Sequence, residues 1–197
     1  MNDRRIRKAQ PDEMNKITAL MTVAFCNDPF ARWIYPEPEM YLAHFPQYFK
    51  IFSEEAFSQD TAFVAEPFAG VAMWHPPGTD FDERALGQHF TETVPPERLA
   101  EMGALLTEME EQTPEEDVWY LPMIGVDTKF QGQGVGNLLM QSVLAQTDQI
   151  KIATHLESSN PANVPFYNRL GYETVAEIKT SKTAPLMTVM HRSPHST

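Results

Sequence analysis

Apolar residues recur at helical spacing through much of the chain. Pro11-Asp12-Glu13 opens a segment in which every third or fourth residue is apolar, which predicts a helix. A second helix is predicted from Met40 to Phe57, where aromatic residues recur at the same spacing and Pro46 breaks or kinks the run. Residues 79–117 carry further helical patterns, which predict a helical insert.

Shorter apolar segments, bounded by turn residues, predict β-strands. Pro67 and Phe68 join two of them as a hairpin-like pair, and Pro76-Pro77-Gly78 ends the second. The predicted strands include Ile6 to Ala9, Thr61 to Glu66, Gly70 to Trp74, Glu173 to Lys179 and Leu186 to His191.

The composition is that of one globular domain. With 197 residues, of which 42% are hydrophobic and 21% charged, the chain can bury a substantial core. We expect a single domain over residues 1–192 and a disordered tail over residues 193–197. The single cysteine, Cys26, excludes an intramolecular disulfide and is expected to pack in the core.

The net charge of −12 argues against nucleic acid or an anionic membrane surface as a partner, because each needs a clustered basic face. The chain has no signal segment and no run of ~18 apolar residues, which predicts a cytoplasmic protein. Scattered histidines and one cysteine, without paired-ligand spacing, predict no metal site.

Between residues 121 and 140, a strand pattern runs through a glycine-rich turn into a helix pattern. Gly132, Gly134 and Gly136 lack a Cβ, so the main chain can bring several N–H groups close to an anion at the start of the helix. The turn therefore predicts a phosphate site. A dinucleotide fingerprint would need glycine at Asn137, and a nucleoside-triphosphate loop would need Gly-Lys followed by Ser or Thr.

The pattern that remains, Gln131-x-x-Gly134-x-Gly136, resembles the pyrophosphate arm of the GNAT superfamily of acetyl-CoA-dependent N-acetyltransferases. The segment from His155 to Tyr172 is similar to the superfamily's second signature, in which a strand parts from its neighbour to admit the cofactor's pantetheine. Over the whole length, the order of segments is most similar to the puromycin N-acetyltransferase-like members, notably from Glu157 to Tyr167.

The resemblance implies the GNAT fold, an α/β (α+β) architecture with a central mixed, mostly antiparallel sheet of about six to seven strands flanked by helices. It also implies acetyl-CoA as co-substrate and a cofactor-binding core at about residues 118–175. Gly125 interrupts an apolar strand, where glycine often marks a bulge or a close approach by a ligand. The resemblance implies a bulge here that presents main-chain N–H groups to the acetyl carbonyl. The cofactor-binding residues implied are Ile124, Gly125, Val126, Gln131, Gly132, Gln133, Gly134, Val135, Gly136, Asn137, Asn160, Asn163, Phe166 and Tyr167.

Acetyl transfer from a thioester to an amine requires a neutral amine, a polarised carbonyl and a proton for the departing thiolate. Tyr167 is the predicted general acid, because a phenol stays protonated at neutral pH. Glu157 is the first candidate for the base, directly or through water, and His75 is the second. Either can instead be structural, and an amine that arrives neutral needs no base.

The predicted acceptor is the amine of a small molecule, and the chain is expected to be a monomer or homodimer. An acidic run from Glu108 to Asp117 is either solvated surface or a funnel for a cationic amine. Transfer to a protein or peptide amine, and non-catalytic binding of acyl-CoA as a sensor, stay open as alternatives. The aromatics expected in the core, some of them in contact with substrate, are Phe30, Trp33, Tyr35 and Tyr41.

Overall fold

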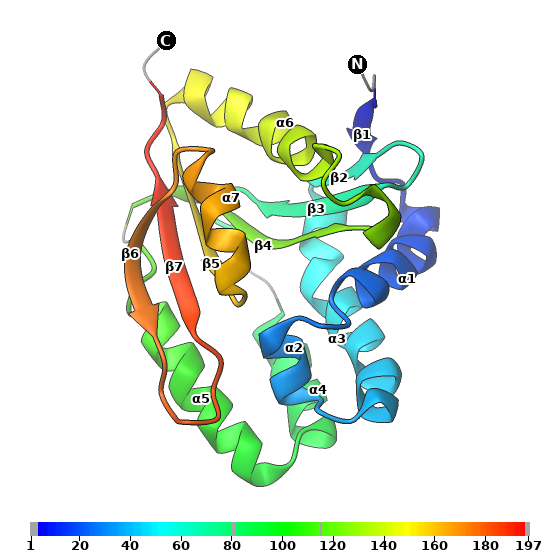
Figure 1. Cartoon of the computed structure of the whole chain (residues 1–197), viewed down its shortest axis with the longest axis vertical. Coiled ribbons are helices and arrows are strands. Elements are labelled where there is room, and N and C mark those ends of the chain that lie inside the picture. The colour runs from blue at the N-terminus through cyan, green and yellow to red at the C-terminus, as the bar shows by residue number, and fades with distance from the viewer. Residues whose placement is uncertain (1–3, 80–81, 115, 196–197) are drawn as a thin grey trace.

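A seven-stranded sheet forms the centre of the protein in a computed structural model that describes residues 4–79, 82–114 and 116–195 (Figure 1). The strand order is β1-β2-β3-β4-β5-β7-β6, and every neighbouring pair is antiparallel except β4 and β5. This confirms the predicted mixed, mostly antiparallel sheet. The strands are β1 (Ile6–Lys8), β2 (Ala62–Ala65), β3 (Gly70–His75), β4 (Val118–Val126), β5 (Ala153–Ser158), β6 (Glu173–Ile178) and β7 (Met187–Arg192).

Helices cover both faces of the sheet (Figure 1). The first five pack on one face, whereas α6 and α7 pack on the other. The predicted helical insert is confirmed as α4 and α5. The helices are α1 (Met14–Ala24), α2 (Pro29–Ile34), α3 (Pro38–Ser58), α4 (Glu83–Thr93), α5 (Pro96–Glu110), α6 (Val135–Ile150) and α7 (Val164–Asn168), and the 3₁₀ turns are η1 (Pro11–Glu13), η2 (Thr128–Phe130) and η3 (Pro161–Asn163).

The aromatic stripe of α3 is buried, as its spacing predicts. Phe45 and Phe49 are fully buried, and the Tyr41 hydroxyl donates to the Thr22 carbonyl at 2.7 Å. The predicted break at Pro46 does not occur, because α3 continues through it. Proline lacks the N–H that would pair with the carbonyl four residues earlier. That carbonyl belongs to Leu42, which is 63% exposed, so water can take the place of the missing donor.

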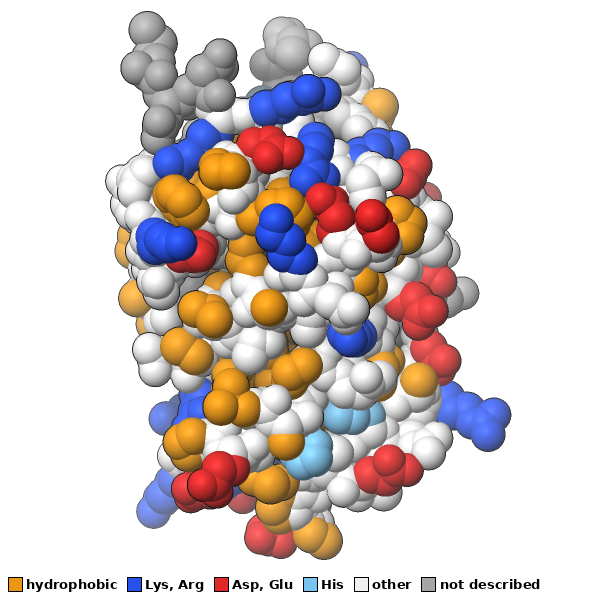
Figure 2. Space-filling view, turned by 90° about the vertical axis from the view of Figure 1, so that its right-hand side faces the viewer, with side chains coloured by type: hydrophobic (Ala, Val, Ile, Leu, Met, Phe, Trp, Pro, Cys, Tyr) orange, Lys and Arg blue, Asp and Glu red, His pale blue; other side chains and the backbone are white. Residues whose placement is uncertain are grey.

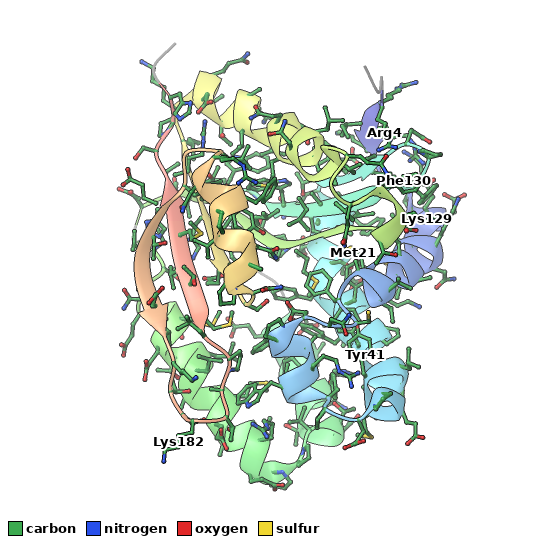
Figure 3. All side chains as sticks on the ribbon, in the orientation of Figure 1. Arg4, Met21, Tyr41, Lys129, Phe130 and Lys182 are labelled. Carbon is green, nitrogen blue, oxygen red and sulfur yellow. The ribbon has the colours of Figure 1, made fainter. Side chains whose placement is uncertain are left out.

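Gly125 lies where α1 packs directly on β4. A Cβ at this position would lie 2.6 Å from Met21 Sδ and 3.0 Å from Ala24 Cβ (Met21 is labelled in Figure 3). The strand is regular here, because Gly125 pairs with Val71 in register. The prediction of a bulge at Gly125 is therefore wrong: this glycine lets a helix approach the strand.

Gly125→Val is expected to destabilise the fold by about 1–3 kcal/mol, because the branched side chain must displace Met21 from a packed region. The matched control is Gly103→Val on α5, where nothing lies within 4 Å of an added Cβ. The control should change stability by less than about 0.5 kcal/mol. Denaturant unfolding measures both variants, and a Gly125 variant as stable as the wild type would contradict the packing argument.

Two further predictions, on Cys26 and on the C-terminal tail, differ from the structure. Cys26 is exposed in the turn after α1, so the prediction that it packs in the core is wrong. The main-chain N–H of His195 donates to Asp148 at 2.8 Å, so an ordered contact extends into the tail predicted to be disordered, while residues 196–197 lie outside the described residues. In the described ranges, no helix combines the length and apolar character needed to cross a bilayer.

Candidate active site

β4 and β5 run parallel but pair only at their first residues. Their last paired residues are Tyr120 and His155, and the strands part beyond this point (Figure 1). β5 stays paired with β7 up to Ser158, and β4 stays paired with β3 up to Val126, so each strand keeps its other neighbour where the two part. The main-chain groups on the facing edges of the two strands are thereby available to a ligand.

A bulge in β4 lies where the strands part. The register between β3 and β4 shifts between Met73 and His75, which leaves residues 121 and 122 opposite Trp74 alone. Pro122 has no N–H to contribute to the ladder, which suits it to a bulge. The bulge predicted at Gly125 therefore lies three to four residues earlier, and its signal in the sequence is the proline.

A cavity of about 1030 Å³ opens between the parted strands and the helices of one face. Aromatic side chains of α3 and Leu and Met side chains of α5 supply apolar walls, so the insert shapes this cavity. Among the described residues that line it, there is no Lys or Arg. Its six carboxylates belong to Asp28, Glu83, Glu110, Glu116, Asp117 and Glu157.

The acidic run is split between the cavity and the solvent. Glu110, Glu116 and Asp117 line the cavity and are exposed, which places negative charge at its open side. Glu108 and Glu111 are exposed and do not line it, and Glu115 lies outside the described residues. The positions of Glu110, Glu116 and Asp117 are therefore consistent with a funnel, and those of Glu108 and Glu111 with solvated surface.

Glu157 lies deep in the cavity, on β5 just beyond the last paired residue. Its side chain is only 7% exposed, and its Oε1 lies 2.7 Å from His155 Nε2. Tyr120 of β4 faces the same carboxylate. Burial, together with the charge of Glu157 and the hydrogen bond to it, raises the pKa of Tyr120 well above its ordinary value.

Tyr167 reaches the cavity from α7, on the opposite side of β5. Its side chain is 6% exposed and lines the cavity, as do Glu157 and Ile124. Burial, and then the charge of Asp28, raises the pKa of Tyr167 above its ordinary value. The phenol is therefore protonated throughout the neutral range.

Asp28 is a cavity residue that the sequence analysis did not select. It caps α2, where its carboxylate accepts from the main-chain N–H of Ala31 at 2.9 Å and from the Ser159 hydroxyl. Burial raises the pKa of Asp28, while these hydrogen bonds oppose that shift. The sequence signal was Asp28-Pro29 before an aromatic segment, which is a common helix start.

His75, the second candidate base, also lines the cavity. It ends β3, and its ring lies 6.1 Å from the Tyr120 ring. Burial lowers the pKa of His75 to about 4, and the nearby charge of Glu55 opposes this only in part. His75 is therefore a neutral imidazole at pH 7, and both candidate bases, His75 and Glu157, line the cavity.

The glycine turn lies outside the cavity, at the start of α6. Gly132 and Gly134 have φ values of +71° and +81°, a conformation that favours glycine, and nothing lies within 4 Å of an added Cβ at either position. The turn is held by Gln131, whose side-chain amide donates to the Val126 carbonyl at 3.2 Å. The first turn of α6, which includes Val135, Gly136 and Asn137, presents main-chain N–H groups beside this open space.

Positive charge gathers at this turn, although the chain as a whole is acidic. Arg4 donates to Gln133 at 2.8 Å, and its guanidinium carbon lies 4.8 Å from the centre of the Phe130 ring. Lys129 lies on the same ring, at 5.8 Å, and Figure 3 shows these residues together. Figure 2 shows Lys and Arg side chains on the upper part of this side of the molecule, with acidic residues among them. Arg4 precedes β1 and is more than 120 positions from the turn, so no local motif indicated it.

Residues of the second signature, from His155 to Tyr172, pack α7 against α6 and also line the cavity. A Cβ on Gly136 would lie 3.3 Å from the Phe166 ring, so this glycine lets α7 approach α6. Asn160 caps η3, because its side-chain oxygen accepts from the Ala162 N–H at 3.0 Å. Asn163 lines the cavity instead.

The four aromatic residues that were expected in the core or in contact with substrate also divide between the cavity and the core. Phe30 lines the cavity. The other three are buried in the core and do not line it, namely Trp33, Tyr35 and Tyr41.

The sequence matches the acetyltransferase (GNAT) domain family over residues 87–191, just over half of the chain. An N-acetyltransferase of Schizosaccharomyces pombe is 24% identical over 222 residues, which cover 96% of this chain and 83% of that protein. A Corynebacterium glutamicum protein described as histone acetyltransferase HPA2 and related acetyltransferase shares the fold, with a TM-score of 0.72, 24% identity and 98% of each chain covered. A Drosophila melanogaster polyamine N-acetyltransferase does so with a TM-score of 0.68 and 16% identity, over 98% of this chain and 100% of that one. The chain therefore belongs to the GNAT family of N-acetyltransferases.

Proposed function

We propose that this enzyme moves the acetyl group of acetyl-CoA to the amine of a small, cationic molecule by direct transfer. The cavity carries this proposal, because six carboxylates and no Lys or Arg line it within the described chain. Such a cavity attracts ammonium groups and repels anions. Its apolar walls favour an acceptor with a hydrocarbon or aromatic body.

The residues present fit acetyl-CoA at two places. The open space beside Gly132 and Gly134, with the N–H groups of α6, suits the diphosphate, and Arg4 adds positive charge there. The parted edges of β4 and β5 suit the pantetheine. In this arrangement Ile124 and Val126 of β4 would lie beside the pantetheine. When bound, acetyl-CoA supplies an acetyl thioester whose sulfur needs a proton as it leaves.

The two catalytic roles are assigned by position and charge. Glu157 accepts the proton that the acceptor ammonium must lose, either directly or through water, and its carboxylate lines the cavity for this purpose. Tyr167 holds its phenolic proton on the other side of β5 and donates it to the leaving sulfur.

The small-amine class has a second support. The Drosophila polyamine N-acetyltransferase that shares this fold catalyses the formation of N-acetylagmatine. The run from Glu157 to Tyr167 favours a puromycin N-acetyltransferase-like member, which would also act on a bulky amine. We expect a cytoplasmic monomer or homodimer.

Pairs of acceptors that differ by one carboxylate test this proposal. Thiol release from acetyl-CoA should be at least about tenfold faster, as kcat/KM, with agmatine than with arginine, and with tyramine than with tyrosine. The added carboxylate of each amino acid would face the carboxylates of the cavity, and like charges brought together are strongly unfavourable. Polyamines, aminonucleoside antibiotics and short peptides complete the panel. Equal rates within both pairs, or no thiol release with any amine, would contradict the proposal.

A further inference from the structure

His155 contacts the proposed base, yet it takes no part in the chemistry described so far. Its side chain is 2% exposed, and its Nε2 lies 2.7 Å from Glu157 Oε1. The two residues are on the same face of β5, two positions apart, at the point where β4 and β5 part. Both line the cavity.

We propose, on the basis of the proposed function, that His155 is a positioning residue whose Nε2–H holds the Glu157 carboxylate charged and in place for the acceptor ammonium. A carboxylate only accepts hydrogen bonds, so the nitrogen that faces it must carry the proton. This assigns neutral His155 to the Nε2–H form. Nδ1 then carries a lone pair, and within the described chain it is buried without a hydrogen-bond partner.

The need for such a donor follows from the burial of Glu157. Removal of a carboxylate from water favours its neutral form, and a neutral acid cannot take a proton from an ammonium group. Hydrogen bonds donated to the charged form counter this effect. His155 and Tyr120 supply these donors from β5 and β4, and no described Lys or Arg lines the cavity to do so instead.

The surroundings keep His155 in this role. The His191 ring of β7 lies 4.7 Å from the His155 ring, and the Tyr120 ring lies 5.7 Å from it. Burial lowers the pKa of His191, so His191 adds no cation at neutral pH. The titratable groups that face the pair or its immediate neighbours from other elements are Tyr120, His191, His75, Tyr48 and Glu116.

Two amide variants separate positioning from general packing. In His155→Gln the side-chain amide nitrogen comes close to the place of Nε2, whereas in His155→Asn it is one carbon shorter and cannot reach Glu157. For the Asn variant we expect kcat/KM at pH 7 to fall about tenfold or more. The acid limb of its kcat/KM–pH profile should move up by about one pH unit, as expected from the loss of one hydrogen bond to a charged group. The Gln variant should stay within about threefold of the wild type, with its acid limb in place.

Control measurements separate a loss of positioning from a general loss of packing or folding. His89→Gln alters a buried histidine outside the cavity lining and should leave the acid limb in place. Thermal unfolding and calorimetric binding of acetyl-CoA confirm that each variant is folded. The proposal is overturned if neither amide variant shifts the acid limb, or if both shift it equally. Its failure differs from that of the proposed function, because amine acetylation by the wild type decides the latter independently.

Discussion

Tyr167→Phe is expected to lower turnover by roughly 10²-fold or more, while the affinity for acetyl-CoA stays within about twofold of the wild type. The substitution removes only the hydroxyl that carries the donated proton, and the buried ring keeps its packing against Phe166 and Tyr172. Because burial raises the pKa of Tyr167, the wild-type phenol stays protonated at every pH at which the enzyme is assayed. Steady-state thiol release measures turnover, and titration calorimetry measures binding.

Tyr172→Phe provides the matched control for this result. Tyr172 is also a buried tyrosine, but its hydroxyl accepts from Thr154 at 2.8 Å and does not line the cavity. The control should lose some stability and keep its turnover within about threefold. If Tyr167→Phe turned over as fast as the wild type, another group would have to protonate the leaving sulfur.

Glu157→Gln is expected to reduce kcat/KM at pH 7 by roughly 10²-fold, because an amide cannot accept the proton of the ammonium group. The change in shape is small, and the amide oxygen can still accept the hydrogen bond of His155. The activity of the variant should recover as pH rises toward about 10, because an aliphatic amine then loses its proton to the solvent. A pH–rate profile of both enzymes, with a primary alkylamine as acceptor, measures the recovery.

Glu177→Gln on β6 is the corresponding control, since this carboxylate is exposed and lies outside the cavity lining. Its profile should match that of the wild type. A Glu157 variant with wild-type activity at pH 7 would contradict the assignment of this carboxylate as the base.

Most elements of the fold could be predicted from short-range patterns. The spacing of apolar residues marked α1 and α3, and the alternation of strands and turns marked the sheet within one or two residues at most ends. The two signatures indicated the GNAT fold because each combines glycines with a strand and a helix start. The family comparison confirms that assignment.

The remaining features depend on contacts between distant segments, which no local pattern contains. The local pattern predicts a bulge at Gly125, but the side chains next to this glycine belong to Met21 and Ala24, about 100 positions earlier. The bulge at residues 121 and 122 depends on the register with β3. Arg4, which precedes β1, reaches the glycine turn across 129 positions of sequence. Only the assembled sheet brings such pairs together.

The hydrogen bond between Ser159 and Asp28 joins residues 131 positions apart, across the two halves of the chain. Both recognised signatures lie in the later half, together with the strands that part, whereas α2 and α3 of the earlier half contribute to the cavity wall. Under the proposed function, the coenzyme site draws mainly on the later half of the chain, and the earlier half supplies part of the wall around the acceptor. Substitutions in α2 and α3 are therefore expected to change which amine is accepted more than they change the affinity for the coenzyme, which would give the scaffold a route to new acceptors.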